Sequence, residues 1–152
     1  MLVTPVSYTL AVGAAEGLTP LNAFDNALLA AGIGNVNLVR VSSILPPGAK
    51  YVEALQIPPG SLVPTAYCTC TSAVPGEWIT AAVAVGLSRD SFGVIMEYEG
   101  TGKREEAEAE VTRMLEAAFE RRQMKLHEVR IQGVDHQVKT LGSVVAAAVL
   151  WY

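Results

Sequence analysis

The sequence is poor in cysteine and in positive charge. Its 152 residues include two cysteines, and 11 Lys and Arg stand against 15 Asp and Glu, for a formal net charge of -4. Because nucleic acids and anionic membranes bind clustered basic residues, this acidic balance argues against both as partners. It favours a small cationic ligand instead.

The two cysteines, Cys68 and Cys70, stand two residues apart in a strand-like run. Their side chains therefore point to the same side but are poorly placed to form a disulfide with each other. We expect reduced residues that pack in the core. A metal site would need more ligands nearby, and His127 and His136 lie far away in the sequence without an obvious grouping, so no metal is expected.

Long hydrophobic runs are missing as well. The run "VVAAAVLWY" at the C-terminus is far below the ~20 residues needed to cross a bilayer. The N-terminus, "MLVTPVSYTL", lacks the basic start of a signal peptide. Both observations lead us to expect a cytoplasmic protein without a membrane partner.

Small apolar residues, in contrast, are abundant. The apolar fraction is 51% and the mean hydropathy is +0.32, with Ala and Val supplying much of both. A chain of this length suffices for one domain with a hydrophobic core and is short for two. We therefore expect a single domain, 1–152, whose apolar surfaces form close-packed layers or subunit interfaces.

The apolar periodicity predicts a strand, a helix, about four strands, a second helix and two final strands. The first helix has Thr19 as its N-cap, Pro20 at its first position and Gly32 as its stop. The second is opened by Thr101 and covers residues 103–124. The expected strands are 5–13, 35–45, two within 61–88 that are interrupted at 74–77, 92–100, 126–136 and 142–152. Because each helix has one apolar face, we expect an α+β layered sandwich with a helix outside each of two facing sheets.

Asp25 is the acidic residue of interest in the first helix. It lies beside the predicted apolar stripe of the helix, next to Leu21, Leu28 and Leu29 at offsets of three and four residues. The stripe consists of Leu21, Phe24, Leu28 and Ala31. We expect its carboxylate to be at least partly shielded from water.

Glu97 and Glu99 point to the same side of the predicted strand 92–100, and Glu97 directly follows the apolar run "GVIM". Burial at this position would raise the pKa of Glu97 and make it a proton donor near neutral pH. The alternative is a solvated strand end, which is the commoner environment of a surface acid.

The stretch "VSSILPPG", residues 41–48, places Ser42 and Ser43 between an apolar strand and a rigid turn. Two such hydroxyls commonly form a hydrogen-bonded turn. In a strained turn, however, the second hydroxyl can attack the preceding carbonyl and convert the amide to an ester. Elimination and hydrolysis then leave a pyruvoyl group, whose ketone forms a Schiff base with a substrate amine and accepts the electrons released by decarboxylation.

Five segments carry a resemblance that runs in order from about residue 8 to residue 152: "EGLTPLNAFDNALLAAGIGNVNLVRVSSILPPG", "LVPTAYC", "VPGEWITAAVAVG", "GVIMEYEG" and "LGSVVAAAVLWY". Together they resemble the pyruvoyl-dependent arginine decarboxylases. The resemblance implies self-cleavage between Ser42 and Ser43, which yields a β chain of residues 1–42 and an α chain of residues 43–152 headed by a covalent pyruvoyl group. The implied reaction converts L-arginine to agmatine and carbon dioxide.

The same resemblance implies roles for three further residues. Asn37 would assist processing and order the site, Asp25 would receive the substrate guanidinium, and Glu97 would protonate the α-carbon after decarboxylation. It also implies a four-layer αββα sandwich that assembles as trimers, or dimers of trimers, with active sites shared between subunits. Two alternatives stay open: decarboxylation of another amino acid such as histidine, and an uncleaved subunit that serves as a non-catalytic oligomer.

Overall fold

The computed structural model describes residues 2–152, which form two helices and nine strands in two sheets. Neither helix in this part of the chain is long and apolar enough to cross a membrane. In chain order the elements are β1 (Ser7–Glu16), α1 (Pro20–Ala30), β2 (Asn37–Arg40), β3 (Ile44–Leu45), β4 (Lys50–Tyr51), β5 (Leu62–Ser72), β6 (Trp78–Leu87), β7 (Gly93–Thr101), α2 (Arg104–Arg121), β8 (Glu128–Gln137) and β9 (Gly142–Trp151).

The larger sheet has the strand order β2-β5-β9-β1-β4. Its central strand β9 pairs antiparallel with β1 on one side and with β5 on the other. All residues of β9 except Trp151 are buried. A strand covered on both faces reads as a continuous apolar run, which explains the stretch "SVVAAAVL".

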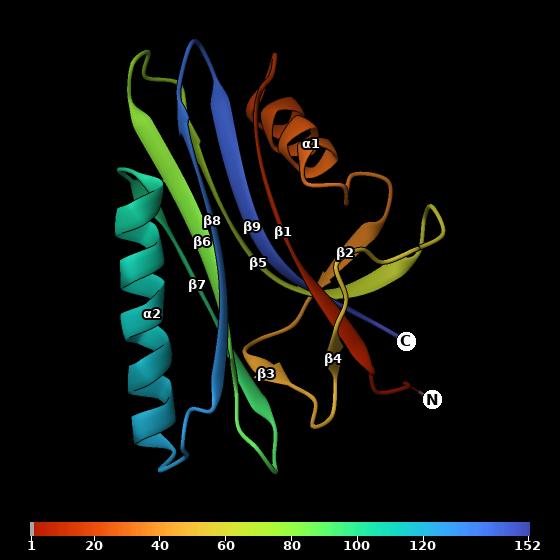
Figure 1. Cartoon of the computed structure of the whole chain (residues 1–152). Helices are drawn as coiled ribbons and strands as arrows, with labels where there is room; N and C mark the ends of the chain where they lie inside the picture. The colour runs from red at the N-terminus through yellow and green to blue at the C-terminus, as the bar shows by residue number, and fades with distance from the viewer. Residues whose placement is uncertain (1) are drawn as a thin grey trace.

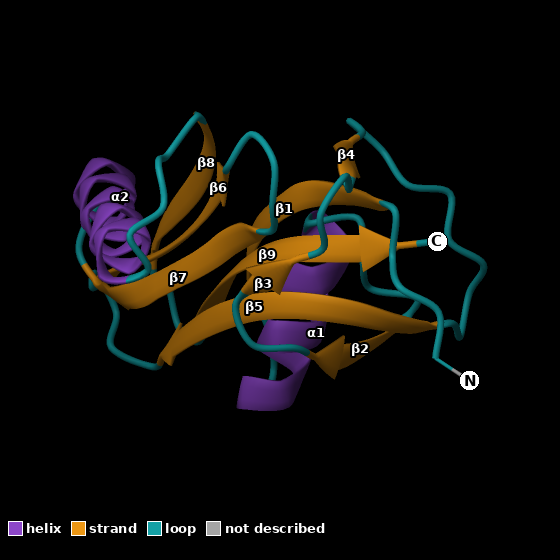
Figure 2. Ribbon diagram, turned by 90° about the horizontal axis from the view of Figure 1, so that it is seen from below, coloured by secondary structure: helices purple, strands orange, loops and turns teal. Residues whose placement is uncertain are grey.

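The smaller sheet has the order β3-β7-β6-β8, and its central strand β6 is buried from Ile79 to Gly86. Figure 1 shows α2 outside this sheet and α1 outside the five-stranded sheet, with the two sheets between them. Figure 2 shows α1 lying across strands of the five-stranded sheet. Three apolar clusters fill the contacts between these parts of the molecule. The predicted α+β class, with two helices and two sheets, is confirmed.

Helix α1 begins as expected, because the Thr19 hydroxyl accepts a hydrogen bond from the Asn22 N–H at 3.1 Å. Gly32 follows the helix with a φ of +80°, a conformation that glycine adopts without strain. The expected apolar stripe is confirmed at Leu28, which is buried, and at Phe24 and Ala31, which are half-buried, whereas the expected burial of Leu21 and shielding of Asp25 are wrong. The buried residues are Ala23, Ala27 and Leu28, whereas Asp25 is exposed.

A close approach between α1 and β1 explains this difference. A methyl group on Gly13 of β1 would overlap the carbonyl oxygen of Ala27. Small residues on both elements therefore bring the helix backbone against the sheet, and the helix turns its alanine face inward. Leu21, which was expected in the apolar stripe, is left 74% exposed on the outside.

Helix α2 begins one residue after the expected start and ends three residues before the expected end, and Thr101, which was expected to open the helix, is the last residue of β7. One of its first N–H groups is satisfied from another element: the Asp135 carboxylate of β8 accepts a hydrogen bond from the Arg104 N–H at 2.8 Å. The predicted apolar face is confirmed, with Met114 half-buried. The fully buried residues are Ala107, Val111, Leu115, Ala118 and Phe119.

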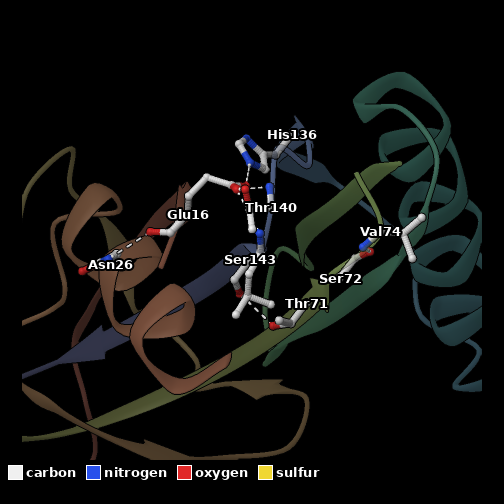
Figure 3. A network of polar contacts seen from close by, with 9 residues as sticks. Glu16, Asn26, Thr71, Ser72, Val74, His136, Thr140 and Ser143 are labelled. Atoms are coloured by element: carbon white, nitrogen blue, oxygen red, sulfur yellow. Dashed lines mark hydrogen bonds and ion pairs between the residues drawn. The ribbon is translucent and has the colours of Figure 1, made fainter. Parts of the chain in front are cut away.

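The turn between β8 and β9 is tied to the end of β1 by Glu16 (Figure 3). Its carboxylate accepts hydrogen bonds from the N–H groups of Thr140 and Leu141 at 2.7 and 3.0 Å, and it lies 2.6 Å from Nε2 of His136. Burial alone would raise the pKa of Glu16, but the bonds from His136 and from these backbone groups outweigh it and lower the pKa to about 2.

Candidate active site

The chain changes from one sheet to the other at Ser42 and Ser43. The Val41 N–H donates to the carbonyl of Thr65 in the five-stranded sheet at 3.1 Å, and the Ile95 N–H of the four-stranded sheet donates to the Ser43 carbonyl at 2.7 Å. The expected continuous strand 35–45 is therefore wrong. Apolar periodicity could not reveal the break, because the segments on both sides of it are apolar and extended.

This crossing places Ser43 beside β7. Ile44 pairs with Val94 and Leu45 with Gly93, and the bond from Ile95 extends the same register to Ser43. Residues that face each other in an antiparallel pair share one side of the sheet, and alternate residues along a strand do too. Ser43 therefore lies on the side of the sheet to which Glu97 points, two residues along β7.

A polar pocket lies where β2 ends and β5 becomes the edge of the five-stranded sheet. The Arg40 guanidinium sits above the Tyr67 ring, 4.1 Å from its centroid. The residues that line the pocket are Arg40, Tyr67, Cys68, Thr69, Glu97 and Glu99.

Glu97 is half-buried in this pocket and has an altered acidity. Burial raises its pKa from 4.5 to about 7, the Arg40 charge opposes the rise, and the Glu99 charge adds to it. Of the two environments that the sequence left open for Glu97, the structure has the shielded one with a raised pKa, whereas Glu99 is exposed. Glu97 can therefore hold or release a proton near neutral pH.

The cysteines behave as expected from the sequence. Both are free thiols that pack against the cluster between the sheets, with Cys68 buried and Cys70 half-buried. Burial, with added repulsion from Glu99 and Glu97, raises the pKa of Cys68 to about 12. This thiol is thus a neutral part of the pocket wall.

Asn37 lies at the other end of β2 and is exposed. Its side-chain amide donates to the Gly60 carbonyl at 3.1 Å, and its main-chain N–H donates to the Ser61 carbonyl at 2.8 Å. It therefore holds the turn that the second Pro-Pro-Gly sequence forms with Ser61. It does not line the pocket that contains Glu97.

Asp25 is also outside this pocket, on the helix that covers the outer face of the five-stranded sheet. Of the four residues with expected catalytic or binding roles, Ser43 and Glu97 lie on the same side of the four-stranded sheet, two residues apart in register, whereas Asp25 and Asn37 lie elsewhere. Sequence reasoning did not identify Arg40 as part of the site. The feature that could have indicated Arg40 is its charge, which stands alone within the apolar run "NLVRV".

Comparison with known proteins finds a family model, described as pyruvoyl-dependent arginine decarboxylase, that matches residues 7–152. The chain is 51% identical to the pyruvoyl-dependent arginine decarboxylase of Methanocaldococcus jannaschii, over 97% of this chain and 91% of that protein. It is 44% identical to the protein of the same name from Pyrococcus furiosus, over 99% of this chain and 97% of that protein. A relative from Methanococcus maripaludis is 43% identical, over 97% of this chain and 92% of that protein.

Proposed function

Because the chain belongs to the pyruvoyl-dependent arginine decarboxylase family, we propose that it converts L-arginine to agmatine and carbon dioxide with a covalent pyruvoyl group. The observation that carries this proposal is the Ser42-Ser43 crossing beside Glu97, the half-buried acid with a pKa near 7. A pyruvoyl carbonyl supplies the electron sink that amino acid decarboxylation requires.

The pyruvoyl group forms from Ser43 by self-cleavage, which divides the domain into residues 1–42 and 43–152. The Ser43 hydroxyl attacks the Ser42 carbonyl carbon, and the peptide C–N bond gives way to an ester. Elimination breaks the C–O bond at Ser43 and releases the Ser42 carboxylate, and water then converts the remaining dehydroalanine to the ketone with loss of ammonia. The bonds from Val41 to Thr65 and from Ile95 to Ser43, which hold the chain on both sides of the scissile bond, support this step.

Glu97 acts as the acid that returns a proton to the α-carbon. Its pKa near 7 supports this role, because a large fraction of the carboxyl group is protonated at neutral pH and the conjugate base forms readily on transfer.

Asp25 receives the guanidinium of arginine in bidentate geometry. Since it is exposed on α1 and does not line the pocket of its own chain, it serves an active site completed by a neighbouring subunit. Asn37 is a positioning residue, because its bonds to Gly60 and Ser61 hold the start of the strand that leads to the scissile bond.

The chain is a four-layer αββα unit that assembles in the cytoplasm as trimers or dimers of trimers. Large apolar side chains that are exposed in the single chain support assembly, because isolated monomers rarely expose many of them together. They include Leu18, Leu21, Val39, Ile44 and Leu62.

Two measurements on the purified protein test this function. Denaturing mass spectrometry should find two chains that separate between Ser42 and Ser43, and incubation with L-arginine should yield agmatine. A single intact chain that forms no agmatine would instead indicate a non-catalytic subunit. Preferential turnover of histidine would keep the chemistry and change the substrate.

A further inference from the structure

We propose that Arg40 is a positioning residue whose guanidinium, held on the Tyr67 ring, is the fixed positive charge that opposes Glu99 at the proton donor Glu97. The inference rests on the proposed function, because it concerns the residue that protonates the α-carbon. It adds Arg40, Tyr67 and Glu99 to the machinery that sets the acidity of that residue.

The main chain of Arg40 is fixed by strand pairing, and its exposed side chain is held by one aromatic contact. Arg40 is the last residue of β2, it pairs with Thr65, and the next residue bonds to the Thr65 carbonyl. Its guanidinium lies 4.1 Å from the centroid of the Tyr67 ring, a distance typical of a cation–π contact. Tyr67 in turn stacks with Phe24 of α1, with 6.3 Å between the ring centroids. This anchored ring favours one place for the charge over the many rotamers of a free arginine.

The charged and titratable groups around Glu97 come from three strands. Arg40 of β2 lowers the pKa of Glu97, and Glu99 of β7 raises it. Strand β5 contributes the Cys68 thiol and the Tyr67 phenol, both of which line the pocket. Strand β6 places the uncharged Val83 beside Glu97. Cleavage adds the Ser42 carboxylate, but this group is common to the wild type and every cleaved variant, so it cancels in a comparison.

The pKa of Glu97 is set by influences of opposite sign. Burial and Glu99 both raise the pKa of Glu97, and Arg40 opposes this rise. A simpler role for Arg40 is protection of a sheet edge, since charged residues on edge strands discourage aggregation. Edge protection requires no particular partner and predicts no change in the acidity of Glu97.

Substitutions that remove a positive or a negative charge separate the control of Glu97 acidity from edge protection. In Arg40→Gln the alkaline limb of the plot of kcat against pH should move to higher pH, on the order of one pH unit. The reason is that loss of the positive charge raises the pKa of Glu97, so the carboxyl group stays protonated to higher pH. In Glu99→Gln the limb should move to lower pH. Arg113→Gln and Glu116→Gln, which remove the same charges from the exposed face of α2, are matched controls and should leave the limb in place.

Variants of Tyr67 test the ring that holds the charge. Tyr67→Phe keeps the ring and should preserve the profile, whereas Tyr67→Leu should move the limb in the direction of Arg40→Gln by a smaller amount. Arg40→Lys keeps the charge and should lie between the wild type and Arg40→Gln. If Arg40→Gln does not fold, Glu99→Gln and Tyr67→Leu must still move the limb in opposite directions.

A second readout does not depend on turnover. NMR titration of the Glu97 carboxyl group in the uncleavable Ser43→Ala protein should show the same opposite displacements. An active wild type whose variants share one alkaline limb, or a Glu97 titration unmoved by Arg40→Gln and Glu99→Gln, would overturn the inference. Absence of agmatine from the wild type, with the titration displaced as expected, would overturn the proposed function alone.

Discussion

Replacing Glu97 with glutamine should stabilise the protein at alkaline pH while it removes the proposed acid. Burial raises the pKa of Glu97 from 4.5 to about 7. The fold therefore favours the neutral carboxyl group and disfavours the carboxylate. Since the folded pKa is the higher one, stability from this residue is complete below pH 4.5 and is lost as the pH rises toward 7.

The size of this effect follows from the two pKa values. They differ by about 2.5 pH units, which at about 1.4 kcal/mol per unit gives a ceiling of about 3.5 kcal/mol. Glu97 is only half-buried, and solvent screens part of the interaction, so we expect about half of the ceiling, about 1.5 to 2 kcal/mol. Glu97→Gln should therefore raise the free energy of unfolding by this amount at pH 8 and change it little at pH 4.5.

Denaturant unfolding at a fixed protein concentration measures this difference, because assembly makes apparent stability depend on concentration. Both proteins should carry Ser43→Ala, so that neither is cleaved and their chains stay comparable. Glu116→Gln, an exposed substitution on α2, is the control and should have little effect at either pH.

A variant that is no more stable than its parent at pH 8 would refute the reasoning, since the carboxylate would then carry no desolvation penalty. A gain of equal size at both pH values would also refute it, because the gain would not arise from ionisation. In the cleavable protein, Glu97→Gln should lower kcat by about 100-fold or more, the usual contribution of a general acid. Substitution at an active site often exchanges activity for stability in this way.

Three further perturbations have expected outcomes. Asp25→Asn should raise the KM for arginine about 10-fold or more, because a bidentate ion pair with the guanidinium is lost, and an unchanged KM would assign the guanidinium to another residue. Glu16→Gln should lower the free energy of unfolding by about 1 to 2 kcal/mol at pH 7, and because the pKa of Glu16 is about 2, this loss should diminish as the pH falls from 4.5 toward 2 in denaturant unfolding. Cys68 should react slowly with iodoacetamide at pH 8 and rapidly after denaturation, because burial keeps its thiol protonated; equal rates in both states, measured by mass spectrometry, would contradict its place in the core.

The sequence by itself determined the α+β class, both helices, the packing role of the cysteines and the family. These properties depend on periodicity, caps and motifs, which are local in the chain. Thr19, Pro20 and Gly32 mark the first helix, and the apolar face of α2 repeats at helical spacing. The acidity of Glu97 was also within reach, because the apolar run before it already indicated desolvation.

Only the tertiary structure decided how the strands and side chains meet. It divided the expected strand 35–45 between two sheets at Ser42 and Ser43, because hydrogen bonds to Thr65 and Ile95 come from elements distant in the sequence. It turned Asp25 outward, because Gly13 and Ala27 allow a close approach that periodicity does not record. It also brought Arg40 above Tyr67, in the pocket that holds Glu97. Such contacts depend on which distant residues become neighbours, and no local pattern encodes that.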